Sequence, residues 1–175
     1  TENYRQIGES RVASDRKLFF PVPDVKLWDL ENPVLYEVKT ELLQNGNVLD
    51  ENITLFGFRT AVFLQDGFYL NGKKVKLRGL NRHQSYPYVG YAMPESMQKR
   101  DADILKNELG VNAVRTSHYP QSRHFVERCD ELGLLVFTEI PGWQHIGDEI
   151  WKKQAVENVK DMVEQYRNHP SVILW

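Results

Sequence analysis

The hydrophobic pattern of the chain changes its period near Val62. Before that point, "LYEVKTELL" at 35–43 alternates apolar and polar residues, and "NGN" at 45–47 has the composition of a turn. The run "ITLFGFRTAVF" at 53–63 then continues in an extended pattern. Alternation on both sides of a short turn predicts a β-hairpin, which we expect to be part of a β-sandwich.

A second hairpin and a series of strand–helix units follow. In "GFYLNGKKVKLRGLN", Asn71 and Gly72 lie between short apolar runs, as in a two-residue hairpin turn. From Val75 onward, short apolar runs alternate with longer segments of helical period. The apolar runs are the predicted strands "VKLRGL", "VNAVR", "LLVFTE" and "SVILW". Strands that are apolar on both faces and alternate with helices predict a parallel sheet covered by helices, either doubly wound or a barrel.

Three helices are expected between these strands. The first runs from Glu95 to Leu109, because Pro94 precedes it and Gly110 provides a stop. The second ends at Gly133, and the third ends before the sequence Asn-His-Pro at 168–170. The last two helices carry apolar stripes that we expect to be core, formed by Phe125, Val126, Cys129 and Leu132 and by Val156, Val159, Met162, Val163 and Tyr166.

Composition and charge argue against several classes of partner. The chain has 175 residues, of which 41% are apolar and 26% are charged, and its net charge is -2. The sequence contains neither a basic cluster nor an apolar run near the roughly 20 residues of a membrane span. Nucleic acid and membrane are therefore not expected as partners. The single cysteine, Cys129, lies in a helical pattern and is expected to be a buried thiol rather than a nucleophile, so it does not define the compartment.

Polar residues gather where the predicted strands end. They are Asn81, Arg82 and His83 after the first strand, Arg115, Thr116, Ser117, His118 and Tyr119 at the end of the second, and Glu139 and Trp143 after the third. Because the carboxyl ends of parallel strands meet at one edge, we expect these side chains on one rim. Aromatic rings beside charged groups suit a sugar, whose apolar faces pack on the rings and whose hydroxyls need donors and acceptors.

Purely structural roles explain the same residues. Arg115 and Glu139 on neighbouring strands could form an ion pair that only holds the rim together, and His118 could cap the turn that follows. The five histidines show neither a pair at metal-binding helical spacing nor His-x-His on a strand, which argues against a metal site. No glycine-rich loop follows a predicted strand, which argues against nucleotide binding.

Three motifs, in this order and at these separations, resemble glycoside hydrolase family 2, the family of β-galactosidases, β-glucuronidases and β-mannosidases. They are "LRGLNRHQSYP", "NAVRTSHYPQSRHFVERCDELGLLVFTEIP" and "YRNHPSVILW". The resemblance runs from about Trp28 to Trp175 and implies a multidomain β plus α/β chain. It implies that residues 1–63 end an immunoglobulin-like β-sandwich and that residues 64–175 are the first half of a (β/α)8 TIM barrel.

The resemblance also implies roles for individual side chains. His83 and His118 match histidines that contact the sugar at the scissile bond, and Arg115 matches an arginine that keeps the catalytic nucleophile ionised. Glu139 matches a barrel carboxylate near that arginine, and Trp143 lies near the sugar-binding rim. Where metal-dependent β-galactosidases have Glu-x-His, this chain has "PGWQH", so no cofactor is expected and the departure argues against a magnesium site of that kind.

The resemblance places both catalytic glutamates beyond Trp175, the acid/base in an Asn-Glu pair and the nucleophile on a later strand. Retaining glycosidases need two carboxyl groups about 5 Å apart, so this chain alone is expected to be inactive. A barrel of this type takes about 250 residues. Half a barrel would leave the strand Ser171–Trp175 with an apolar edge and the barrel interior unfilled, which predicts aggregation or pairing with another half. The expected partners are a carbohydrate substrate and the remainder of the parent chain, and an oligomer is possible.

The expected function is that of a segment of a retaining glycosidase that cleaves terminal β-linked sugars. A β-galactoside is the preferred substrate, because β-galactosidases are the commonest members of the family that the motifs resemble. Three alternatives stay open. They are β-glucuronidase or β-mannosidase specificity, a non-catalytic carbohydrate-binding or assembly segment, and a metal-dependent hydrolase on a similar barrel.

Overall fold

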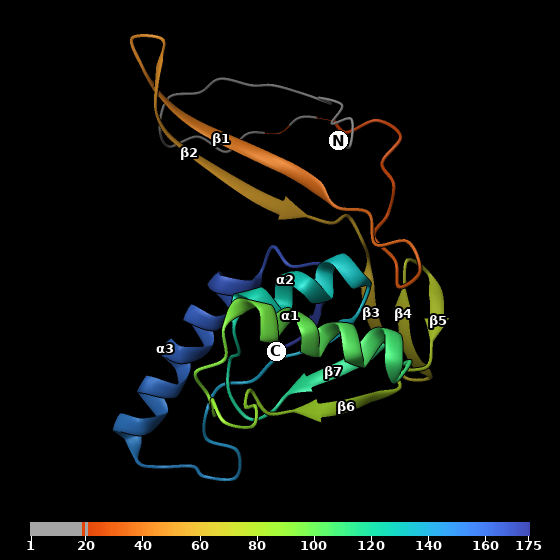
Figure 1. Cartoon of the computed structure of the whole chain (residues 1–175), viewed down its shortest axis with the longest axis vertical. Coiled ribbons are helices and arrows are strands. Elements are labelled where there is room, and N and C mark those ends of the chain that lie inside the picture. The colour runs from red at the N-terminus through yellow and green to blue at the C-terminus, as the bar shows by residue number, and fades with distance from the viewer. Residues whose placement is uncertain (1–18, 20) are drawn as a thin grey trace.

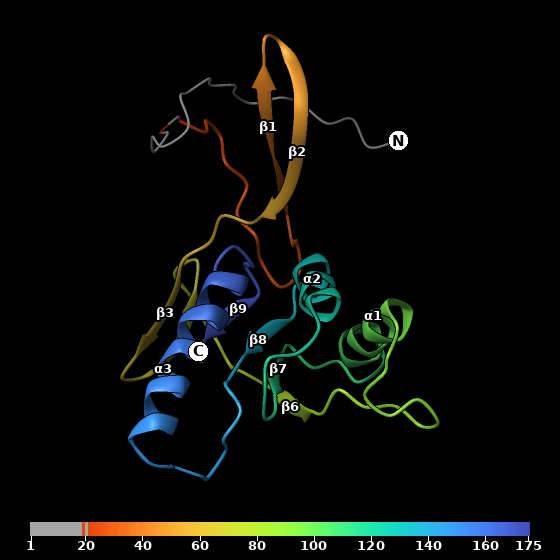
Figure 2. The ribbon, with the colours of Figure 1, turned by 90° about the vertical axis from the view of Figure 1, so that its left-hand side faces the viewer.

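The computed structural model describes residue 19 and residues 21–175, and its first two strands form a β-hairpin (Figure 1). Strands β1 (Tyr36–Gln44) and β2 (Asn47–Phe56) pair antiparallel. Figures 1 and 2 both show this hairpin projecting away from the rest of the molecule. Positive φ angles of 53° at Asn45 and 82° at Gly46 suit a tight hairpin turn. The predicted hairpin is confirmed, but within the described residues it forms a two-stranded sheet, so the β-sandwich around it stays a prediction.

A second antiparallel sheet connects the hairpin to the helical part of the chain. It contains β3 (Ala61–Leu64), β4 (Gly67–Leu70) and β5 (Lys73–Val75), in this order. The expected turn at Asn71 and Gly72 joins β4 to β5, with φ angles of 51° and 77°. The second predicted hairpin is therefore confirmed, with β3 as an additional strand beside it.

The extended run predicted over 53–63 is interrupted in the structure. β2 ends at Phe56, and β3 pairs with β4 instead of extending the first hairpin. Between the two strands, the Arg59 guanidinium donates to the carbonyl oxygens of Pro170 and Val172, at 2.9 and 2.5 Å. These contacts connect the segment to the residues at and just before β9, and the extended run is therefore divided into two strands that belong to different sheets.

The remaining strands form the parallel sheet that the hydrophobic pattern predicted. Its order is β6 (Gly79–Arg82), β7 (Ala113–Thr116), β8 (Leu135–Phe137) and β9 (Val172–Leu174). The helices are α1 (Glu95–Asp103), continued by the π-helical segment η1 (Ile104–Glu108), α2 (Arg123–Leu132) and α3 (Glu149–Tyr166). The first parallel strand begins at Gly79 and not at Val75, because Val75 belongs to the preceding sheet. The four strands form an open sheet and not a closed barrel.

Two glycines allow close approaches within this arrangement. A Cβ at Gly79 would collide with the carbonyl oxygen of Ala113, so glycine lets β6 lie against β7. Gly133 ends α2 with a φ of 67°, the left-handed conformation that favours glycine. A Cβ there would collide with the carbonyl oxygen of Leu30, so this glycine also lets the N-terminal segment pack on the end of α2.

The main hydrophobic core lies between the parallel sheet and its helices. It contains Ala102, Leu105, Val114, Phe125, Val126, Cys129, Leu134, Val136, Met162, Tyr166 and Val172. A second cluster contains Trp28, Leu30, Phe68, Leu70, Ala113 and Leu135, and it joins the β3–β5 sheet to β7 and β8. Cys129 is fully buried, and burial raises the pKa of its thiol well above its usual range. The expectation of a buried thiol is confirmed.

The apolar stripe of α3 is only partly buried. Met162 and Tyr166 are 3% and 1% exposed, whereas Val156 and Val159 are 54% and 37% exposed. The helix has 18 residues, which span about 27 Å. The neighbouring strands β8 and β9 have three residues each, which span about 10 Å. The first part of α3 therefore extends past the sheet, and the prediction that its whole stripe is core was wrong.

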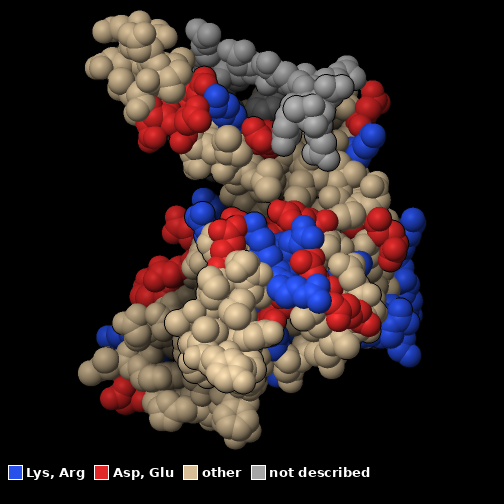
Figure 3. Space-filling view, viewed as in Figure 1, with Lys and Arg blue, Asp and Glu red and all other residues tan. Residues whose placement is uncertain are grey.

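Charged side chains of both signs are interspersed over the face that α1 and α2 present in Figure 3. Arg128 pairs with Asp103 at 2.7 Å and with Glu131 at 2.6 Å, and Arg100 pairs with Glu108 at 2.5 Å. This face is therefore balanced in charge. Within residues 21–175, none of the helices combines the length and the apolar character that crossing a bilayer requires.

Candidate functional site

The candidate site lies at the carboxyl ends of β6, β7 and β8. His83 directly follows β6, His118 lies two residues beyond β7, and Glu139 lies two residues beyond β8. Since neighbouring parallel strands end at the same edge of a sheet, these side chains start from adjacent positions. Arg115 comes from within β7 and lines a hollow on the inner face of the sheet.

The Glu139 carboxylate connects the charged groups of the site. Its Oε2 accepts hydrogen bonds from Nε and Nη2 of Arg115, at 2.9 and 2.7 Å. Its Oε1 lies 2.6 Å from Nδ1 of His118. The Glu139 and His118 side chains are each 26% exposed, so their electrostatic interaction is less screened than one at the open surface. The ion pair that the sequence suggested is thus present, and it also reaches a histidine.

The contact with Glu139 indicates which ring nitrogen of His118 carries a hydrogen. An ionised carboxylate only accepts hydrogen bonds, so Nδ1 of His118 is the donor. The 3.4 Å separation between Nδ1 and Nη2 of Arg115 then joins two donors and is not a hydrogen bond. In the neutral ring Nε2 is an acceptor, which suits a hydroxyl group of a ligand.

Two aromatic rings lie close to the His118 ring. The Trp143 ring is 5.4 Å from the His118 ring, with 31° between the planes, and the His83 ring is also 5.4 Å away, at 76°. Trp143 is 69% exposed and has a φ of 47°, a left-handed conformation that bulky residues rarely adopt. Its exposed indole offers a flat apolar surface on which the face of a sugar ring can pack.

The structure therefore brings together all five side chains for which the resemblance implied a place at the sugar site. They are His83, Arg115, His118, Glu139 and Trp143. Each member of this cluster contacts at least one other member. A turn-capping role does not describe His118, because its Nδ1 is engaged by a side chain from the neighbouring strand.

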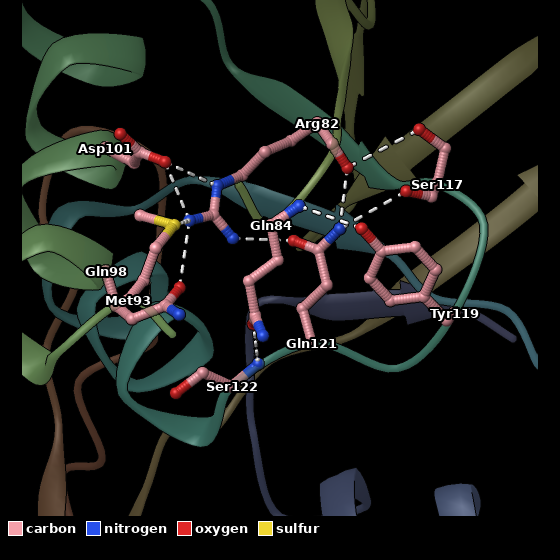
Figure 4. A network of polar contacts seen from close by, with 9 residues as sticks. All are labelled: Arg82, Gln84, Met93, Gln98, Asp101, Ser117, Tyr119, Gln121 and Ser122. Atoms are coloured by element: carbon pink, nitrogen blue, oxygen red, sulfur yellow. Dashed lines mark hydrogen bonds and ion pairs between the residues drawn. The ribbon is translucent and has the colours of Figure 1, made fainter. Parts of the chain in front are cut away.

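Arg82 does not face this cluster, although it belongs to the same polar run as His83. Its side chain is 6% exposed, and its guanidinium lies 3.9 Å from the centre of the Phe125 ring on the helix side of the sheet. Figure 4 shows it among side chains of α1 and of the loop between β7 and α2. Successive side chains of a strand point to opposite faces, so Asn81 and Arg82 lie on opposite faces of β6. This alternation is the signal in the sequence that separates Arg82 from the rim.

No group of three or more histidine, cysteine, aspartate or glutamate side chains is placed to hold a metal ion within the part of the chain that the structure describes. His145 is the histidine of the "PGWQH" sequence. Its ring packs against Trp151, with 5.5 Å between the ring centres and 90° between the planes.

An open parallel sheet with covering helices and a charged aromatic rim at the carboxyl ends of its strands define an α/β protein of the doubly wound or (β/α) barrel class. Residues 62–175 match the family described as "Glycosyl hydrolases family 2, TIM barrel domain", and residues 2–59 match the family described as "Glycosyl hydrolases family 2". The first match alone spans more than half of the chain, so the chain belongs to glycosyl hydrolases family 2. The resemblance carried by the three motifs is confirmed.

Similar proteins include β-galactosidases and β-glucuronidases. The chain is 66% identical over 152 residues to the beta-galactosidase of Thermoanaerobacterium thermosulfurigenes. The aligned residues cover 87% of this chain and 21% of that protein. It is 58% identical over 149 residues to the beta-galactosidase of Thermoanaerobacter pseudethanolicus, covering 85% of this chain and 20% of that protein. The structure of Bacteroides uniformis beta-glucuronidase 3 matches with a TM-score of 0.78 and 44% identity, covering 86% of this chain and 19% of that one. The chain thus spans about a fifth of the length of these relatives.

Proposed function

We propose that this chain is a segment of a longer retaining β-glycosidase, to which it supplies residues that bind the sugar and support the catalytic nucleophile. The observation that carries the proposal is the joint engagement of Glu139 by Arg115 and His118 at the carboxyl ends of neighbouring strands. Membership of glycosyl hydrolases family 2 supports the reaction class. Since the chain spans about a fifth of its relatives, the remainder of a parent chain completes the site.

Each side chain of the cluster has a role in this proposal. His118 uses Nδ1 to bind Glu139 and presents Nε2 to a sugar hydroxyl, while His83 contacts the sugar beside it. The exposed Trp143 indole packs against the apolar face of the pyranose. Arg115 places a positive charge beside the nucleophilic carboxylate, which favours the ionised form of that group.

The two catalytic carboxyl groups come from the remainder of the parent chain in this proposal. A retaining glycosidase uses one carboxyl group as the acid/base and a second, about 5 Å away, as the nucleophile. Glu139 does not suit either role, because Arg115 engages one of its oxygens and His118 engages the other. This chain alone is accordingly expected to bind sugar without hydrolysing it.

A terminal β-galactoside is the proposed substrate, because this chain is 66% and 58% identical, over 152 and 149 aligned residues, to two relatives named beta-galactosidase. A β-glucuronide is the second candidate. It is favoured by the match to a solved beta-glucuronidase at 44% identity and to the Ruminococcus gnavus b-glucuronidase in complex with D-glucuronic acid, at 31% identity with a TM-score of 0.80.

Turnover of p-nitrophenyl β-glycosides by the full-length protein that contains this chain tests the proposal. We expect kcat/KM to be higher for the β-galactoside than for the β-glucuronide and the β-mannoside. Arg115→Ala should lower kcat about 100-fold or more, because the charge beside the nucleophile is lost. Arg123→Ala is the matched control, since Arg123 lies on α2 with a side chain that is 70% exposed, and kcat should stay near the wild-type value.

The possible outcomes separate the alternatives. A protein that hydrolyses no β-glycoside but binds the free sugar would overturn the glycosidase assignment in favour of a carbohydrate-binding role. Preference for the β-glucuronide would overturn only the choice of sugar. Near-normal turnover of Arg115→Ala would remove the role given to that side chain.

A further inference from the structure

A buried polar cluster lies on the helix side of the sheet (Figure 4), and two of its residues directly precede the histidines of the candidate site in the sequence. Its members are Arg82, Gln98, Ser117 and Gln121, which are 6%, 2%, 0% and 3% exposed. Buried polar groups are destabilising unless they are paired, so a cluster of this kind requires a defined set of hydrogen bonds. Two of these hydrogen bonds, from Ser117 and Gln121, connect the backbone of β6 to the loop after β7.

The Arg82 guanidinium is held by side chains from two elements. Its Nε and Nη2 donate to Oδ2 of Asp101, at 2.9 and 2.7 Å, and Nη2 also donates to Oε1 of Gln98 at 2.9 Å. Both of these partners come from α1. From the loop before α2, Oε1 of Gln121 accepts from Nη1 at 2.6 Å. The buried charge is therefore compensated by Asp101, and the planar guanidinium has one well-defined orientation.

Gln121 differs from Gln98 because it also binds the backbone of β6. While its Oε1 accepts from the Arg82 guanidinium, its Nε2 donates to the carbonyl oxygen of Arg82 at 2.6 Å. One glutamine thus bonds to both ends of the same arginine. The Ser117 hydroxyl donates to the same carbonyl oxygen, at 3.4 Å. The Arg82 carbonyl is consequently one point at which β6 is joined to the loop after β7.

This junction is adjacent in sequence to both histidines of the candidate site. Arg82 immediately precedes His83, and Ser117 immediately precedes His118. The two imidazole rings lie 5.4 Å apart. A displacement of the Gln121 side chain would therefore change the position of one histidine relative to the other.

A second pair of hydrogen bonds joins the same segments on the other side of the histidines. The backbone N–H of Ser122 donates to Oε1 of Gln84 at 2.6 Å, and the backbone N–H of Gln84 donates to the Tyr119 hydroxyl at 3.1 Å. Gln84 follows His83, and Tyr119 follows His118. The segments that carry the histidines are therefore connected both before and after the imidazoles.

We propose that Gln121, acting through Arg82, is a positioning residue that sets the separation of His83 and His118 and thereby the fit of the site to the transition state. The inference rests on the proposed function, because it takes both histidines as contacts of the sugar. Catalysis is sensitive to such geometry, since a displacement of about 1 Å can lower the rate about 100-fold. Gln121 itself lies below the rim and acts only through the residues that it holds.

Gln121 and Gln98 provide a matched pair of substitutions in the full-length protein, because both are buried and both accept a hydrogen bond from the Arg82 guanidinium. Gln121→Met also removes the donor to the β6 carbonyl, whereas Gln98→Met leaves the backbone junction intact. We expect Gln121→Met to lower kcat about 10-fold or more with a smaller change in KM. Gln98→Met should keep kcat within about threefold of the wild-type value.

Both variants leave a buried guanidinium donor unpaired, so the thermal midpoint should fall in both. A loss of kcat that occurs only in Gln121→Met is then due to positioning and not to lower stability. Kinetic losses that are equal in the two variants would show that the cluster only stabilises the fold, and would overturn the proposal. Wild-type kcat in Gln121→Met would overturn it as well.

A crystal structure of the full-length Gln121→Met variant tests the geometry independently of turnover. We expect the separation of the His83 and His118 rings to depart from 5.4 Å. An unchanged separation would overturn the positioning role. A wild-type protein without glycosidase turnover would instead contradict the proposed function, and the ring separation in the variant would still decide the role of Gln121.

Discussion

Replacement of Glu139 by glutamine is the substitution that most directly disturbs the charged centre of the candidate site. The native carboxylate accepts two hydrogen bonds from Arg115 and one from His118. Glutamine has nearly the same shape and keeps one oxygen acceptor, but its amide nitrogen can only donate. One of the two partners would then face another donor, and the guanidinium would lose its counter-charge.

The expected loss of stability in Glu139→Gln follows from the number and the exposure of these contacts. A hydrogen bond to a charged group contributes about 1.5–3 kcal/mol. The Arg115 and Glu139 side chains are 40% and 26% exposed, so solvent weakens the pair and the lower value applies. With two contacts weakened, the free energy of unfolding should fall by about 3 kcal/mol. Loss of the group that orients His118 should also lower kcat/KM about 100-fold, which corresponds to about 2.7 kcal/mol.

The assay compares kcat/KM on a p-nitrophenyl β-galactoside with the denaturant midpoint for the full-length protein and its variants. Glu149→Gln is the control, since Glu149 lies at the start of α3 with a side chain that is 81% exposed and pairs only with Lys152 among the described residues. The control should change neither quantity. Turnover of Glu139→Gln within about threefold of wild type would refute the claim that this carboxylate orients the sugar site.

Two further predictions concern buried groups in the core behind the site. Cys129 is fully buried with a raised thiol pKa, so peptide mapping should show alkylation by iodoacetamide about 100-fold slower in the native protein than in urea, and similar rates would contradict this. Burial raises the pKa of Tyr166 from 10.0 to about 12, and its hydroxyl donates to the carbonyl oxygen of Gln121. Folding thus favours the neutral phenol, so its stabilising contribution is complete below pH 10 and is lost as the pH rises from 10 to 12. Tyr166→Phe should therefore flatten the fall of the urea midpoint over this pH range, and an unchanged slope would argue against the assignment.

Hydrophobic period was sufficient to predict the parallel strands and the helices between them. The apolar faces of these elements repeat because one side packs in a common core, as Phe125 and Cys129 do on α2. The rule that parallel strands end at one edge also predicted that Arg115 and Glu139 would meet. These features depend on the local hydrophobic pattern and on the order of neighbouring strands, so they can be predicted from the sequence.

Features that depend on strand register were not predictable in the same way. Arg82 and Arg115 both lie near a strand end and precede a histidine, yet Arg115 lines the inner face and Arg82 packs against α2. The run "VKLRGL" reads as one strand but belongs to two sheets, so the first residue of β6 was misplaced. The expectation of one polar rim also overlooked the alternation that puts Asn81 and Arg82 on opposite faces of β6. The left-handed backbone of Trp143 has no pattern in the sequence, since bulky residues rarely adopt this conformation.

The central claim is that the rim formed by His83, Arg115, His118, Glu139 and Trp143 holds a sugar ring. A crystal structure of the full-length protein with galactonolactone, a mimic of the flattened sugar in the transition state, tests it most directly. We expect a sugar hydroxyl within about 3.2 Å of Nε2 of His118 and the apolar face of the ring packed on Trp143. A lactone bound elsewhere, with no contact to either side chain, would contradict it.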